Sequence, residues 1–230
     1  MPTIRIAWPQ AWRVIASRYP PINLFERLTP DMRVWEALIA LEQLTNPRLR
    51  DAVGEIALVP PEERVSGPGA SYVMAAFTHI NPKGSRFSDG SFGVYYAARA
   101  LETAIAETVF HFEAFARDSD DPPRSEDFRA LVGKVEADFA DVEALPDAER
   151  AGILDPGSYA ASQAYARGLR AEGAQGIAYP SVRHAGGQCI GALRPRAVSI
   201  PHQDRHLKYR WNGERVDRYF DYTRDEWIGL

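Results

Sequence analysis

Residues 84–115, GSRFSDGSFGVYYAARALETAIAETVFHFEAF, join a polar segment, a short apolar run and a long alanine-rich run. Ser, Asp and Gly in SRFSDGS predict a turn, because these residues supply the local hydrogen bonds and backbone angles that turns require. The run FGVYYAA predicts a strand, and ALETAIAETVFHFEAFA predicts a helix. The stretch therefore predicts a turn, strand and helix in succession, and the turn carries a single arginine, Arg86.

The predicted helix has an apolar stripe that is expected to face the core. Its members recur every three or four residues: Leu101, Ile105, Val109 and Phe112. Glu107 lies off this stripe, and His111 follows it by one turn on the same face. The two residues could form an exposed pair, which contributes a few tenths of a kcal/mol. Alternatively, Glu107 lines a site together with residues from other elements.

Three further positions are candidates for the same site. Arg86, taken alone, is typical of a solvated turn. Tyr95 and Tyr96 end the predicted strand, and alternate strand residues point to opposite faces, so only one of the two rings can line a cleft. Ser181 follows the apolar run GIAYP, where a serine usually forms a turn. Each position is weak by itself, and a function requires a pattern that joins them.

The rest of the chain mixes strand and helix patterns without a regular alternation of the two. Strands are predicted at WRVIAS (12–17), DFRALVGKVEADFADVEAL (127–145, one or two strands), GIAYPS (176–181) and QCIGALRP (188–195). Helices are predicted at DMRVWEALIALEQLTN (31–46), YVMAAFTH (72–79) and SYAASQAYARGLRAEG (158–173). The tail RHLKYRWNGERVDRYFDY (205–222) has an Asn-Gly pair between two alternating runs and predicts a hairpin. This order favours an α+β fold over a doubly wound sheet.

The N-terminal third is expected to be folded. Asp31 can cap the helix that follows it. Apolar residues at helical spacing give this helix one face that must dock on another part of the protein: Val34, Leu38, Leu41 and Leu44. Pro, Gly and Ser are frequent in residues 60–71, which predicts a boundary there. We therefore expect residues 1–64 to be an N-terminal extension packed on a core domain of residues 65–230.

Composition limits the classes of function. The chain has 27 basic and 31 acidic residues, and the net charge of -4 gives no general attraction to nucleic acid phosphates. A single cysteine, Cys189, cannot form an internal disulfide, and the first residues lack the apolar region of a signal peptide. No apolar run approaches the roughly eighteen residues of a membrane span. We expect a soluble, cytoplasmic protein without direct contact to nucleic acid or membrane.

Several well-known site motifs do not occur in the sequence. It has no G-x-G-x-x-G, no P-loop, no paired C-x-x-C and no G-x-S-x-G. His202 and His206 in HQDRH would share one face of a helix, but Gln203 stands where the metalloprotease motif has glutamate. A solvated loop is the simpler interpretation, and no metal site is expected.

Three blocks of the sequence together resemble the RES domain family, which is named for an arginine, a glutamate and a serine. The blocks are SRFSDGSFGVYYAA, ALETAIAETVFH and GIAYPSVRHAGGQCIGAL. The resemblance covers roughly residues 65–195, and RVIASRYPPINLFE also resembles the start of the longer members. By this resemblance the three positions are Arg86, Glu107 and Ser181, and Tyr96 matches a tyrosine placed ten residues after the arginine.

The resemblance implies a fold similar to that of ADP-ribosyltransferases, with a mixed sheet core, surrounding helices and an N-terminal extension. It implies the toxin of a bacterial type II toxin-antitoxin pair, blocked by an Xre-like helix-turn-helix antitoxin within a hetero-oligomer. The implied substrate is NAD+: the toxin cleaves the nicotinamide-ribose bond and transfers ADP-ribose to a cellular protein, which arrests growth. Two alternatives stay open, namely hydrolysis or phosphorolysis of NAD+ without a protein acceptor, and a non-enzymatic module that binds a partner.

The residue types suit this chemistry. Cleavage develops positive charge on the ribose, which a carboxylate beside the sugar stabilises, and Glu107 is the candidate. A guanidinium such as Arg86 can bind diphosphate or ribose oxygens through two parallel hydrogen bonds. The ring of Tyr96 can stack on nicotinamide, and the hydroxyl of Ser181 can bind the nicotinamide-ribose half. We expect Glu107, Arg86 and Ser181 to act in catalysis, and Arg86, Tyr96 and Ser181 to bind NAD+.

Overall fold

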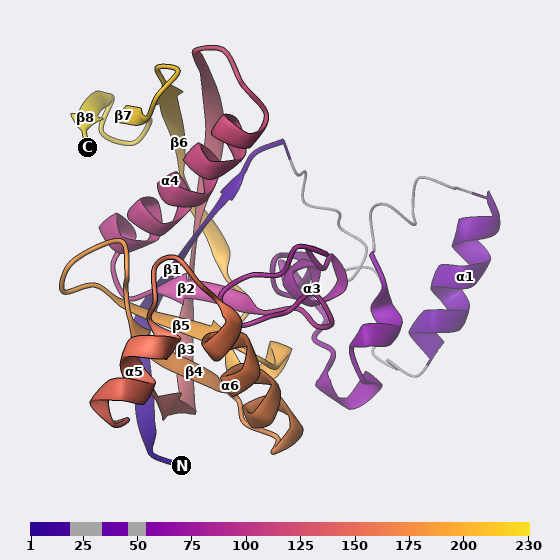
Figure 1. Cartoon of the computed structure of the whole chain (residues 1–230). Helices are drawn as coiled ribbons and strands as arrows, with labels where there is room; N and C mark the ends of the chain where they lie inside the picture. Colours follow the sequence, from indigo (N-terminus) through magenta and orange to yellow (C-terminus); the bar gives the residue numbers. More distant parts are fainter. Residues whose placement is uncertain (19–33, 46–53) are drawn as a thin grey trace.

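The computed structural model describes residues 1–18, 34–45 and 54–230 of the chain (Figure 1). Its strands form one mixed sheet: β1 (Thr3–Ala16), β2 (Tyr95–Ala98), β3 (Arg124–Asp141), β4 (Gly176–Pro180), β5 (Gln188–Ala192), β6 (His202–Trp211), β7 (Val216–Asp221) and β8 (Glu226–Gly229). The helices around it are α1 (Trp35–Thr45), α3 (Ala70–Thr78), α4 (Leu101–Asp118), α5 (Asp147–Ile153) and α6 (Ala160–Ala171). The prediction of an α+β fold with a mixed sheet core and surrounding helices is confirmed.

The long strand β3 organises the sheet. Along one edge it pairs with β1 in antiparallel register, from Thr3 opposite Ala140 to Ala16 opposite Phe128. Along its other edge, the first half pairs with β6 and the last residues pair in parallel with β4. Strand β5 lies between β4 and β2, and β2 reaches β1. Five strands are therefore connected in a ring, and β6, β7 and β8 extend from it as a wing (Figure 1).

Strand β1 is longer than its pattern predicts. The prediction covered only residues 12–17, whereas the strand begins at Thr3. Pro9 lies inside it, and the register with β3 shifts between Trp8 and Ala11. A bulge of this kind tolerates a proline that a regular ladder excludes, because proline has no N–H to donate.

Buried apolar residues form two clusters. One contains α4 residues such as Ile105 and Phe112 together with the centres of β3 and β6. The other contains Tyr95 and the buried residues of α3 and α1. The apolar stripe predicted for residues 100–116 is confirmed, since Ile105 and Phe112 are buried while Leu101 and Val109 are partly buried against the same cluster.

The apolar face predicted for helix α1 is wrong. Val34, Leu38 and Leu41 are exposed, and the buried residues are Trp35 and Ile39. The sequence WEALIAL carries apolar residues on nearly every side, so the periodicity predicts the helix but not which side is buried. Asp31 lies outside the described residues, and the side chain of Leu44 is not described either.

Most of the other predicted elements are confirmed. Residues 127–145 contribute a single strand, and 205–222 form the hairpin of β6 and β7. Asn212 starts the hairpin turn by accepting N–H bonds from Glu214 and Arg215, while Gly213 takes a φ of 101°. The loop predicted at HQDRH is wrong, since residues 202–206 open strand β6.

Two further absences concern the described residues only. Within 1–18, 34–45 and 54–230, no group of three His, Cys, Asp or Glu side chains is arranged to hold a metal ion. None of the helices in those ranges has the length and apolar character needed to cross a membrane.

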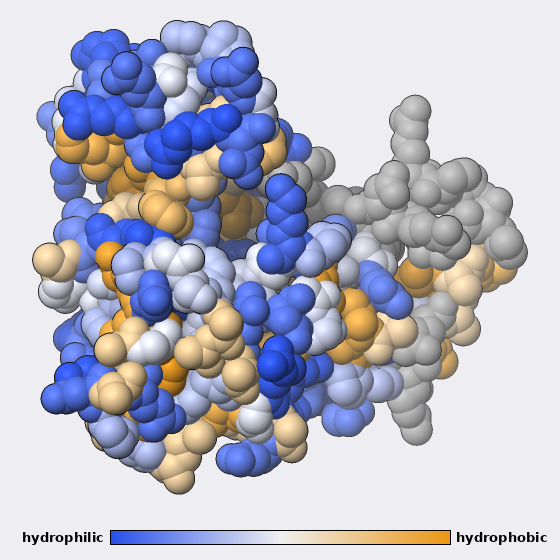
Figure 2. Space-filling view, in the orientation of Figure 1, coloured by the Kyte–Doolittle hydropathy of each residue, from blue (hydrophilic) through white to orange (hydrophobic). Residues whose placement is uncertain are grey.

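On the face shown in Figure 2, hydrophilic side chains predominate, and apolar ones gather in the hollow below α4.

Candidate functional site

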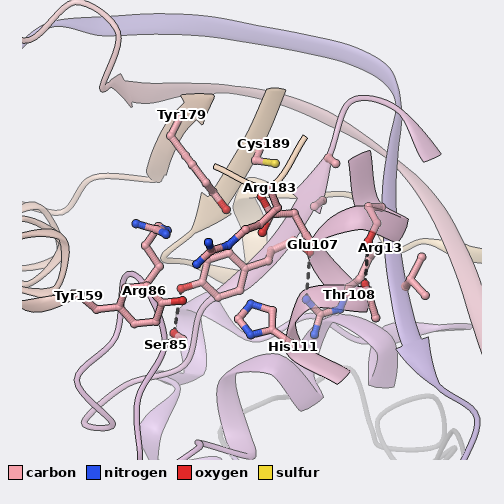
Figure 3. A pocket seen from close by; sticks show the side chains of 15 residues that line it. Arg13, Ser85, Arg86, Glu107, Thr108, His111, Tyr159, Tyr179, Arg183 and Cys189 are labelled. Atoms are coloured by element: carbon pink, nitrogen blue, oxygen red, sulfur yellow. Dashed lines mark hydrogen bonds between the residues drawn. The ribbon is translucent and has the colours of Figure 1, made fainter. Parts of the chain in front are cut away.

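A pocket of about 250 Å³ lies between helix α4 and the strands β2, β4 and β5 (Figure 3). Its lining comes from segments that are far apart in the sequence: Arg13, Val14, Ser85, Arg86, Tyr96, Ala97, Ala98, Ala104, Glu107, Thr108, His111, Tyr159, Tyr179, Arg183 and Cys189. Three of the four predicted site residues, Arg86, Tyr96 and Glu107, are in this lining. The fourth, Ser181, touches it through a hydrogen bond to Glu107.

Arg86 is fixed by main-chain carbonyl groups. Its Nη1 donates to the oxygen of Ile153 at 3.1 Å, at the end of helix α5, and to that of Asp155 at 3.0 Å, two residues later. The guanidinium carbon lies 4.7 Å from the centre of the Tyr159 ring. Arg86 is only 8% exposed, so the interpretation as a solvated turn residue is wrong. The charge is held at the pocket by neutral groups and remains available to an anion.

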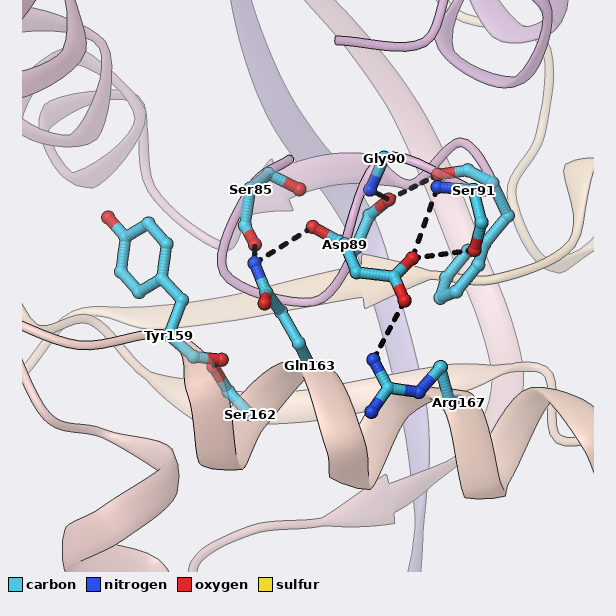
Figure 4. Close-up of polar contacts among 10 residues, drawn as sticks. Ser85, Asp89, Gly90, Ser91, Tyr159, Ser162, Gln163 and Arg167 are labelled. Carbon is cyan, nitrogen blue, oxygen red and sulfur yellow. Dashed lines mark hydrogen bonds and ion pairs between the residues drawn. The ribbon is translucent and has the colours of Figure 1, made fainter. Parts of the chain in front are cut away.

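The turn that carries Arg86 is clamped by helix α6 (Figure 4). Gln163 Nε2 donates to the carbonyl oxygens of Ser85 and Ser88, at 3.0 and 3.1 Å. Arg167 Nη1 binds Asp89 Oδ2 at 2.7 Å. Hydrogen bonds from Ser91 and from Arg167 lower the pKa of Asp89 to about 2. Helix α6 thus fixes both sides of the turn.

Tyr96 is the strand tyrosine that faces the pocket. Its hydroxyl accepts the N–H of Phe87 at 2.9 Å and lies 2.8 Å from Ser85 Oγ. Burial raises the pKa of Tyr96 to about 12, although these hydrogen bonds and Arg86 oppose the rise. Tyr95 packs in the other apolar cluster, as the strand alternation predicts. The ring of Tyr96 is therefore held in the pocket wall by the turn beside Arg86.

Glu107 and Ser181 are in direct contact. Ser181 Oγ donates to Glu107 Oε1 at 2.6 Å and accepts the N–H groups of Arg183 at 3.2 Å and His184 at 3.0 Å. His184 Nδ1 is in turn 2.9 Å from Thr103 Oγ1, one helical turn before Glu107. The simpler interpretations were an exposed pair with His111 for Glu107 and a turn residue for Ser181. Neither interpretation includes the hydrogen bond between Ser181 and Glu107. The serine, which follows β4, thus fixes the carboxylate that α4 carries.

Two titratable side chains flank the carboxylate. Partial dehydration in the pocket lowers the pKa of His111, although part of the ring reaches solvent and Glu107 acts in the opposite direction. Arg183 and Arg86 also lower it. Burial, and next the charge of Glu107, raise the pKa of the Cys189 thiol. The raised pKa keeps the Cys189 thiol uncharged at neutral pH, and Glu107 is the carboxylate that lines the pocket among the described residues.

The sequence analysis did not select several of the residues that line the pocket. Arg13 comes from β1, where its Nη1 binds the carbonyl oxygen of Tyr96 at 3.0 Å and its guanidinium lies over Tyr95. Tyr159 and Arg183 lie in loops. No local pattern distinguishes these residues, because an arginine in a strand or loop is usually a surface residue. Only the block around Ser181, which includes Arg183, could have directed attention to one of them.

The arrangement can bind an anion and stabilise a cation within one cavity. Arginine side chains supply donors for phosphate or ribose oxygens, and aromatic rings supply faces for a flat heterocycle. A fixed carboxylate among them can stabilise positive charge that develops on a bound sugar. The fold and the pocket thus define an α+β protein with an arginine, tyrosine, glutamate and serine site.

Comparison with known proteins identifies the family. The RES domain model matches residues 61–212, and the chain belongs to the RES domain family. It is 30% identical over 208 residues to the uncharacterized protein y4oC of Sinorhizobium fredii (strain NBRC 101917 / NGR234), covering 89% of this chain and 84% of that protein. The structure of this chain is also similar to that of a chain in the solved M. tuberculosis MbcT-MbcA toxin-antitoxin complex. The match has 12% identity and a TM-score of 0.48, and it covers 92% of this chain and 87% of that one.

Proposed function

We propose that the protein cleaves the nicotinamide-ribose bond of NAD+ and transfers ADP-ribose to a cellular protein, as the toxin of a type II toxin-antitoxin pair. The observation that carries the proposal is the 2.6 Å hydrogen bond between Ser181 and Glu107 in a pocket that Arg86 and Tyr96 also line. Residues from three distant blocks meet there, and the chain belongs to the RES domain family.

The carboxylate of Glu107 would act on the transition state. When the bond between the ribose carbon and nicotinamide breaks, nicotinamide leaves as a neutral molecule with the electron pair, and positive charge develops on the sugar. A carboxylate beside the ribose stabilises that charge more than it stabilises neutral ground-state sugar. A nucleophile of the acceptor then bonds to the same carbon and loses a proton. Ser181 orients the carboxylate through its hydrogen bond.

Arg86 and Tyr96 would bind and orient the dinucleotide. Both carbonyl bonds of Arg86 leave from Nη1, so in the described part of the chain its Nε and Nη2 are free to donate to ligand oxygens. Tyr96 offers its ring to nicotinamide while its hydroxyl is occupied by the turn. The proposal needs no metal, because the carboxylate and the neutral leaving group are sufficient.

The test is incubation of the purified protein with NAD+ labelled in the adenylate part and a bacterial lysate. We expect free nicotinamide to be released and a discrete protein band to become labelled. Release of nicotinamide without any labelled protein would replace the transferase by an NAD+ glycohydrolase or phosphorylase, and the products ADP-ribose and ADP-ribose 1-phosphate distinguish these two. If no nicotinamide is released at any protein concentration, the protein is a non-enzymatic module that binds a partner.

The proposed partner is an Xre-like helix-turn-helix antitoxin that blocks the pocket in a hetero-oligomer. DNA contact in such a complex would belong to the antitoxin, because the net charge of -4 gives this chain no general attraction to phosphates. Co-expression with a neighbouring helix-turn-helix reading frame is expected to restore growth and to suppress nicotinamide release. Loss of toxicity without suppression of release would contradict a blocked pocket.

A further inference from the structure

Besides Arg13 and Arg86, Arg183 also reaches the pocket, from the loop that follows Ser181. Arg183 lies between β4 and β5, and its Nη2 donates to the carbonyl oxygen of Pro156 at 3.0 Å. Its guanidinium carbon is 3.5 Å from the centre of the Phe110 ring on α4. Both partners are neutral, so the charge of Arg183 is not compensated by them. Figure 3 shows Arg183 pointing into the space between Tyr179 and His111.

Arg86 and Arg183 are anchored to the same short segment. Arg86 binds the carbonyl groups of Ile153 and Asp155, and Arg183 binds that of Pro156. Both also line the same cavity. Two cations from separate loops are therefore anchored to residues 153–156 and line one cavity.

Neither arginine has an acidic partner among the residues that the structure describes. Across residues 1–18, 34–45 and 54–230, no carboxylate lies within ion-pair distance of Arg86 or Arg183, whereas Arg167 binds Asp89 at 2.7 Å. Among the described residues that line the pocket, Glu107 is the single carboxylate, and its Oε1 already binds Ser181. Neighbouring cations without a counter-ion repel each other. An anion with two negatively charged groups would remove this repulsion and satisfy both guanidinium groups.

We propose that Arg183 is a second diphosphate-binding residue, so that Arg86 and Arg183 each bind one phosphate group of the ligand. A planar guanidinium matches the oxygens of a phosphate with parallel hydrogen bonds, and two of them fix a diphosphate at both groups. The inference deepens the proposed function and rests on it for the dinucleotide. The preference for two linked phosphates rests on the two arginines alone.

The test is calorimetric titration with ADP-ribose, inorganic pyrophosphate and inorganic phosphate. Arg183→Gln is expected to weaken binding of ADP-ribose and of pyrophosphate at least tenfold, while binding of phosphate changes less. Arg183→Lys keeps the positive charge but loses the parallel N–H donors of the guanidinium, so its affinity for the two diphosphates should lie between those of the unaltered protein and Arg183→Gln. Arg99→Gln is the matched control, because Arg99 is exposed, binds Gln188 at 2.9 Å and lies outside the pocket lining. The salt dependence of pyrophosphate binding should also become shallower in Arg183→Gln.

The outcomes separate this inference from the proposed function. If Arg183→Gln binds both diphosphates as tightly as the unaltered protein, or if the unaltered protein binds neither, the inference is wrong. If pyrophosphate binding depends on Arg183 but ADP-ribose does not bind and no nicotinamide is released, the diphosphate site stands and the NAD+ chemistry fails. Thermal unfolding identifies a misfolded Arg183→Gln, in which case Arg183→Lys decides.

Discussion

At the scale of single residues, the charge of Glu107 can be removed without removing its hydrogen bond. In Glu107→Gln the amide oxygen can still accept from Ser181, so the pocket keeps its shape while the negative charge is lost. We expect nicotinamide release to fall at least a hundredfold, which corresponds to about 3 kcal/mol of lost transition-state stabilisation. Glu102→Gln on the exposed side of the same helix is the control and should retain activity. Equal rates for both variants would remove Glu107 from the mechanism.

The ring and the hydroxyl of Tyr96 have separable roles. Tyr96→Phe removes the acceptor of the Phe87 N–H, and a buried donor left without a partner costs about 1–3 kcal/mol. We therefore expect a lower midpoint of thermal unfolding but an almost unchanged KM for NAD+, since the ring remains. Tyr96→Leu should raise KM strongly. A Tyr96→Leu variant with normal KM would show that the ring does not touch the substrate.

At the residue level, the sequence-based selection relied on several blocks that agreed. Arg86, Glu107, Ser181 and Tyr96 were selected from the sequence, and the structure brings them together, although their roles stay predictions. Arg183 was not selected. A guanidinium in a loop has no periodicity and no fixed spacing, and its importance depends on Pro156 and Phe110, which only the folded chain brings near it.

At the scale of elements, helix α6 holds the turn of Arg86 through an ion pair that depends on pH. The folded-state pKa of Asp89, about 2, lies below its ordinary value of 3.8. Its contribution to stability is therefore complete above pH 3.8 and is lost as the pH falls toward 2. We expect the difference in unfolding midpoint between the unaltered protein and Asp89→Asn to be largest near pH 6 and to shrink at about pH 2.5. A difference that does not vary with pH would contradict the lowered pKa of Asp89, to which hydrogen bonds from Ser91 contribute first and the bond from Arg167 next.

The sequence predicted well whether a segment forms a helix or a strand, but it predicted poorly which side of the element is buried. The helix at 158–173 and the hairpin at 205–222 follow from periodicity and from the Asn-Gly pair, which are local properties. The buried side of α1 does not follow from local properties. Trp35 and Val34 are both apolar, and only packing determines which of them is buried. HQDRH joins the sheet because β3 supplies a pairing edge, which no local pattern reveals.

At the scale of the whole molecule, the first strand belongs to the sheet although the family model begins at residue 61. Strand β1 pairs with β3 along its length and buries Trp12 and Val14 in the cluster that borders the pocket. A chain that starts at residue 61 should therefore lose cooperative thermal unfolding. Circular dichroism at increasing temperature provides the measurement. A sharp transition in the shortened chain would show that the division at residue 64 separates a self-sufficient domain.

The ring of strands also determines when the molecule can be completed. Thr3 is synthesised long before Ala140, its partner in the sheet. Ser181, which fixes Glu107, comes later still. A growing chain therefore has no complete pocket around Glu107 until residue 181 has been translated. Under the proposed function, in which the protein is a toxin, this delay would give a co-expressed antitoxin time to bind before the first NAD+ molecule is cleaved.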